Sequence, residues 1–237
     1  MQTILNNSSS THLNSALTSL RSASNSWDQA EGKIQQVDRY ISSADREFRS
    51  AEFPARRASY DNARTDSSWE GRTLDRHFRT ADRNLDSSQW DLRGARRDAD
   101  STGRDIDTGQ SHLGQLEKEY RDNNDPRLGS VQQAMAELNS SESKYGQVDS
   151  QWRRVDSSIG FASNSADRSD FDIRQIMWDR PGTDVSSYGF RVSSNINSIQ
   201  SDLRRVDSEL RRSAMTGDQA ESHLDSAIRI LEGLQTN

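Results

Sequence analysis

Three histidines with similar neighbours are the residues of this chain best suited to hold a metal ion. His12, His112 and His223 each follow a serine or threonine and precede a leucine. Imidazole nitrogens bind zinc and copper, but no glutamate stands three residues before any of them, as it does in di-metal helical bundles. We expect the chain to hold no metal or cofactor. A pH-sensitive layer beside the core is an alternative role for these histidines.

Residues for other catalytic chemistry are missing. The chain has no cysteine, which excludes disulfides, thiolate metal sites and thiol nucleophiles. It contains no glycine-rich phosphate loop and no motif for a serine nucleophile. No pair of carboxylates stands out from the many aspartates as a general acid and base. We therefore expect a protein that is not an enzyme.

Charge and hydropathy limit the possible partners. The net charge is −6, and no segment forms a basic block of the kind that binds nucleic acid phosphates or anionic membranes. No apolar run is long enough to span a bilayer. The first ten residues lack the basic start and apolar centre of a signal peptide. We predict a cytoplasmic protein, with secretion without a cleavable signal peptide as the alternative.

The apolar residues are few but regularly spaced. They make up 30% of the chain, and they recur at alternating steps of three and four residues, which is the pattern of a coiled-coil core. In the first helical stretch the large members are Leu13, Leu20, Trp27, Ile34, Ile41 and Phe48, and the companion row is mostly alanine. The same two rows run from Leu74 to Tyr120, from Val131 to Ile176 and from Val192 to Leu234.

The three prolines, Pro54, Pro126 and Pro181, predict the breaks between helices. We expect helices at about 10–52, 67–122, 126–179 and 184–235, after a flexible tail at 1–9. Asp125 would cap the third helix, with Pro126 in its first turn. Ser67 and Glu70 have the spacing of a capping box, so 55–66 is interpreted as a connector. A second helix that continues from Pro54 is the alternative.

Four long helices joined by sharp turns predict an all-α protein. The arrangement that fits is an elongated up-down-up-down four-helix antiparallel coiled-coil bundle, with 10–237 as one domain.

Four aromatic residues fall outside the core rows. Trp69 and Trp90 share the outermost position of the second helix, and Phe171 and Trp178 share that of the third. Trp69, Phe171 and Trp178 should lie near Phe78 at one end of the bundle, where they either seal that end or form a protein interface. Trp90 has no end to cover, and it is therefore the best single candidate for a contact surface.

Trp69, Glu70 and Gly71 form a W-x-G triplet. The triplet resembles the turn motif of small helical-hairpin proteins exported by type VII machinery. That resemblance implies secretion without a leader peptide. Two features depart from the family: the triplet lies at a predicted helix start, and the segment after Tyr120 lacks the Tyr-x-x-x-acid tail.

The sequence predicts a structural or protein–protein interaction protein, which acts as a scaffold or adaptor. Its partner would be another protein or a second copy of the chain. The alternatives are a leaderless secreted helical protein and a metal-binding bundle that uses the three histidines.

Overall fold

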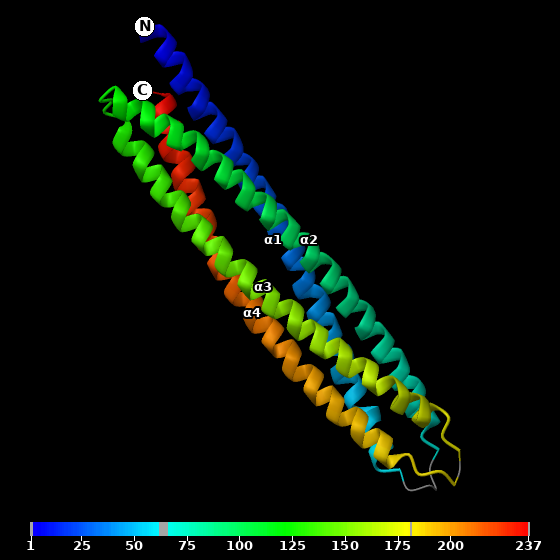
Figure 1. Ribbon diagram of the computed structural model, residues 1–237. Coiled ribbons are helices and arrows are strands. Elements are labelled where there is room, and N and C mark those ends of the chain that lie inside the picture. Colours follow the sequence, from blue (N-terminus) through cyan, green and yellow to red (C-terminus); the bar gives the residue numbers. More distant parts are fainter. Residues whose placement is uncertain (1, 62–65, 181, 237) are drawn as a thin grey trace. The chain divides into compact units, whose positions relative to one another are not determined.

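The part of the protein that the structure describes is all-α. The computed structural model describes residues 2–61, 66–180 and 182–236. These residues form α1 (Gln2–Ser59), α2 (Ser68–Asp122), α3 (Leu128–Met177) and α4 (Ser186–Gln235), with no strand among them (Figure 1). The predicted four-helix bundle is thereby confirmed.

The chain divides into two compact units, and every helix contributes a segment to each. Unit 1 comprises residues 1–33, 94–151 and 212–237, and unit 2 comprises 34–93 and 152–211. In unit 1, Arg21 of α1 pairs with Glu232 of α4 at 2.7 Å, and Arg96 of α2 pairs with Asp149 of α3 at 3.1 Å. In unit 2, Arg154 of α3 pairs with Glu209 of α4 at 3.1 Å.

The core lies where the seven-residue pattern predicts it. Every predicted core position in the four rows is buried, except for Ala99, which is half-buried. Trp152, Phe48 and Leu85 are among the largest side chains that are fully buried. Narrow rows suffice because each helix of a bundle needs only one apolar stripe to cover its neighbours.

The first helix is longer than predicted at both ends. It begins at Gln2, so the expected flexible tail at 1–9 is helical from its second residue. It also passes through Pro54 to Ser59. Proline removes one backbone hydrogen bond from a helix, but the buried row continues through Ala51, Ala55 and Ala58. Packing of these alanines therefore holds the helix together beyond the proline.

The connector is accordingly shorter than 55–66. Residues 55–59 belong to α1, and α2 begins at Ser68, so the helix that continues from Pro54 into α2 does not form. Residues 62–65, within the predicted connector, and Pro181, the third predicted break, lie outside the described residues.

The start of α2 is capped differently from the prediction. Ser67 and Glu70 do not form a capping box: Asp66 accepts the N–H of Ser68 at 2.9 Å, and Glu70 binds Arg57 of α1 at 3.0 Å. The start of α3 follows the prediction more closely. Asp125 accepts the N–H of Arg127 at 2.9 Å, and the helix begins at Leu128, just after Pro126.

The chain consists of two equivalent hairpins, α1–α2 and α3–α4. A shift of 118 residues superposes the two core patterns and also relates Asp61 to Asp179, Asp66 to Asp184 and Gly71 to Gly189. The related residues make the same contacts. Asp179 accepts the N–H of Ser67 at 2.8 Å, and Asp61 accepts the N–H of Val185 at 3.1 Å, so each hairpin caps a helix of the other.

Gly71 and Gly189 each lie against the backbone of a neighbouring helix end. A Cβ at Gly71 would stand 2.3 Å from the backbone nitrogen of Met177, and a Cβ at Gly189 would stand 2.4 Å from that of Ser59. Only glycine allows the helices to approach this closely.

We expect Gly189→Ala to destabilise the protein by about 2 kcal/mol or more, because its new methyl group meets backbone that cannot rotate away. Gly160→Ala is the matched control, since a Cβ there meets nothing within 4 Å. It should stabilise the protein by up to about 1 kcal/mol through better helix propensity. Urea unfolding followed by circular dichroism measures both changes, and equal effects would contradict the close helix contact.

Candidate functional site

The three candidate histidines do not come together as one ligand set. The rings of His12 and His112 lie 5.9 Å apart, and Nε2 of His12 is 3.8 Å from Oε1 of Glu119. His223 instead contacts Glu137 of α3, with its Nδ1 at 2.6 Å from the carboxylate. Within the described part of the chain, no group of three or more histidine, cysteine or acidic residues is arranged to hold a metal ion.

The four aromatics predicted to lie outside the core are all exposed. Trp90 is 68% exposed, Trp178 68%, Phe171 62% and Trp69 56%. Phe78 is buried, and its ring meets that of Phe48 edge-on at 5.2 Å. The end-sealing interpretation is therefore wrong for Trp69, Phe171 and Trp178, because most of each side chain faces solvent.

Sequence reasoning missed further exposed apolar residues, namely Phe53, Tyr60, Phe161, Phe190 and Met215. Phe53 and Tyr60 are seven residues apart, which places them on one face of a helix. This face was not recognised in the sequence because the helix was expected to stop at Pro54. Of all the large exposed apolar side chains in the described chain, only Met215 belongs to unit 1. Among the side chains that the structure describes, unit 2 therefore carries nearly all of the large exposed apolar ones, which are candidates for binding a partner.

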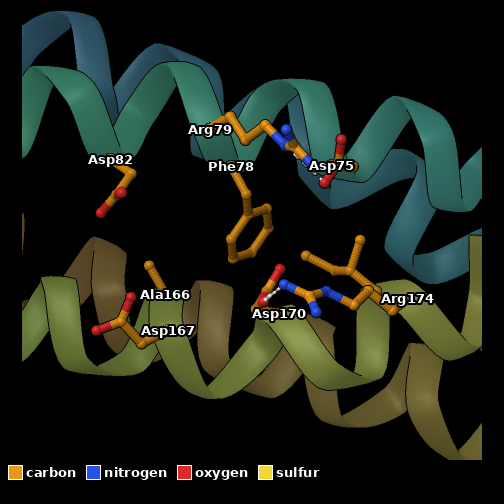
Figure 2. Close-up of a pocket in the computed structure, with 9 residues that line it drawn as sticks. Asp75, Phe78, Arg79, Asp82, Ala166, Asp167, Asp170 and Arg174 are labelled. Carbon is orange, nitrogen blue, oxygen red and sulfur yellow. Dashed lines mark hydrogen bonds and ion pairs between the residues drawn. The ribbon is translucent and has the colours of Figure 1, made fainter.

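Unit 2 also contains a charged groove between α2 and α3 (Figure 2). Its volume is about 480 Å³, and the lining residues are Asp75, Phe78, Arg79, Asp82, Ala166, Asp167, Asp170, Ile173 and Arg174. Figure 2 shows the Phe78 ring between the two helices, with acidic and basic side chains around it.

Two of the groove's carboxylates are neutralised within their own helices. Arg79 pairs with Asp75 at 2.9 Å along α2, and Arg174 pairs with Asp170 at 2.5 Å along α3. Burial raises the pKa of Asp82, and the nearby carboxylates of Asp86, Asp167 and Asp170 raise it further. The groove thus carries excess negative charge next to an apolar floor.

Comparison of the chain with protein-family models, with curated proteins and with solved structures finds no match. The geometry of the chain itself must therefore carry the argument about function. Among the described residues, no helix has the length and apolar character needed to cross a bilayer.

The raised pKa of Asp82 leads to a prediction about stability. A carboxyl group whose pKa is raised in the folded protein stabilises the fold when protonated, and that contribution is lost as the pH rises through the folded pKa. At neutral pH, Asp82→Asn should therefore raise the melting temperature by about 1–2 °C. The gain should disappear as the pH falls towards 3.8, the ordinary pKa of an aspartate.

Thermal unfolding followed by circular dichroism at several pH values measures this change. Asp100→Asn removes an exposed carboxylate from the same helix and serves as the control. A gain at Asp82 that persists at low pH would show that repulsion between carboxylates is not its cause.

Proposed function

We propose that this chain is a non-enzymatic protein-interaction protein that binds its partner through unit 2 and acts as a scaffold or adaptor. The observation that supports this most is the concentration of large exposed apolar side chains in unit 2, Trp90 among them. A tryptophan that is 68% exposed leaves a large apolar surface in water, and burying that surface against a partner is favourable.

The distribution of charge supports the same proposal. Segments 34–93 and 152–211 contain equal numbers of acidic and basic residues, so the net charge of −6 falls entirely on the segments of unit 1. Aromatic residues are enriched at the centres of protein interfaces, and a surface without net charge does not repel a charged partner at long range. A neutral surface that carries exposed aromatics is therefore suited to protein contact, whereas an acidic surface favours solubility.

Trp90→Ala tests the proposal. Tryptophans at the centre of an interface commonly contribute more than about 2 kcal/mol to binding, so the variant should lose partners captured by the wild-type protein from its source cells. Met215→Ala is the matched control, because Met215 is 66% exposed but belongs to unit 1. This control should capture the same partners as the wild-type protein.

Circular dichroism should show unchanged helicity in both variants, since neither side chain is part of the core. Recovery of identical partners by the wild-type protein, Trp90→Ala and a variant lacking the other exposed aromatics of unit 2 would refute the proposed function.

A further inference from the structure

The ends of α1 and α3 carry the same exposed motif. Residues 52–61 and 170–179 share an acidic residue, then phenylalanine, then arginine three residues later, then an aromatic residue followed by aspartate. We name the exposed pair Phe53 and Tyr60 ridge A, and the pair Phe171 and Trp178 ridge B. The two aromatics of ridge A are 64% and 83% exposed, and those of ridge B are 62% and 68% exposed.

Helix capping explains why Asp61 and Asp179 recur, but it does not explain why exposed aromatics recur beside them. Many core positions of the two hairpins are not identical; Trp27, for example, corresponds to Tyr145. Other exposed aromatics have no counterpart: the residue equivalent to Trp90 is Ser208, and the residue equivalent to Phe161 is Ser43. Exposed side chains that recur in both hairpins therefore point to binding, because folding places little demand on them.

Ion pairs at the two ridges are also equivalent. Arg56 pairs with Glu52 beside ridge A, and Arg174 pairs with Asp170 beside ridge B, each within one helix. Both arginines thus have a carboxylate partner before any binding takes place. A partner that covers the ridges would not have to neutralise these charges.

One aromatic ring of each ridge contacts a neighbouring side chain. Arg57 lies over the ring of Phe53 at 5.9 Å and binds the buried Glu70 of α2. At ridge B, the ring of Tyr188 meets that of Phe171 at 6.3 Å.

Arg191 completes the arrangement at ridge B. It lies over the Tyr188 ring at 4.7 Å and forms two hydrogen bonds to the buried Asp172. Side chains that are already ordered lose less entropy on binding, so Phe53 and Phe171 are partly prepared for contact.

We infer that each ridge binds a ridge of a second copy of this chain; the inference rests on the proposed interaction role of unit 2 and adds a contact separate from the one at Trp90. The charge pattern favours this occupant. Because unit 2 is neutral, two copies can meet through it without the repulsion that the acidic segments of unit 1 would cause. A strongly charged partner would gain little at ridges whose arginines are already paired.

Sedimentation velocity over micromolar to near-millimolar concentrations tests this inference on the full chain. The variants are Phe53→Ser/Tyr60→Ser for ridge A, Phe171→Ser/Trp178→Ser for ridge B, and the combination of all four. The wild-type protein should self-associate reversibly. Loss of either ridge should raise the apparent Kd by about tenfold or more and limit assembly to dimers.

Loss of both ridges should leave a monomer. Met215→Ala is the control, since it removes an exposed apolar side chain outside both the ridges and unit 2, and it should associate like the wild-type protein. Circular dichroism should show that every variant stays folded.

Three results would overturn the inference: a wild-type protein that stays monomeric throughout, a single ridge that accounts for all association, or an equal loss with Met215→Ala. Failure of the proposed function looks different. If the wild-type protein is monomeric but Trp90→Ala loses a captured partner, the interaction function stands and only self-association is refuted.

Discussion

The close approach of helix ends at Gly71 and Gly189 is the constraint on which the arrangement of unit 2 depends. Without a Cβ, the first turn of α2 reaches the backbone at Met177, and the first turn of α4 reaches the backbone at Ser59. This proximity lets Asp179 and Asp61 accept N–H groups from the hairpin opposite. A methyl group at either glycine would separate these helix ends and disturb both the caps and the neighbouring ridges.

Burial and charge are distributed differently in the two units. Unit 1 carries the entire net negative charge and, among its described residues, almost no large exposed apolar side chain. Unit 2 is neutral and rich in exposed aromatics. Because every helix runs through both units, one seven-residue core pattern supports two surfaces with different chemistry. The core pattern therefore determines the fold, and the outward positions determine the difference between the units.

The fold was largely predictable from the sequence because the heptad rows are nearly complete. The positions at which the helices end were less predictable. Pro54 was expected to end the first helix, but it lies within α1 because Ala51, Ala55 and Ala58 remain buried around it. Trp90 was correctly predicted to be exposed. The partner of Glu70 was not predictable, since Arg57 belongs to another helix and local spacing favoured a capping box instead.

The ridges could have been found in the sequence through the shift of 118 residues, which relates Phe53 to Phe171 and Tyr60 to Trp178. The exposure of ridge A was not predicted, because the helix was expected to end before Pro54 and its residues were therefore not assigned to heptad positions. Phe171 and Trp178 of ridge B were assigned to the outermost position from the sequence. Likewise, the repeated Ser/Thr-His-Leu tripeptide suggested one histidine cluster. The structure separates His223, which binds Glu137, from the contact between His12 and His112.

The turn between α2 and α3 joins the two equivalent hairpins through very few residues. Asn124 adopts a left-handed φ of 50°, the N–H of Asp125 donates to the carbonyl of Tyr120, and Arg127 lies over the Tyr120 ring. A short link of this kind gives one hairpin a high effective concentration around the other. Packing of one hairpin against the other is then independent of protein concentration. Only contacts with other molecules would depend on how much of the protein is present.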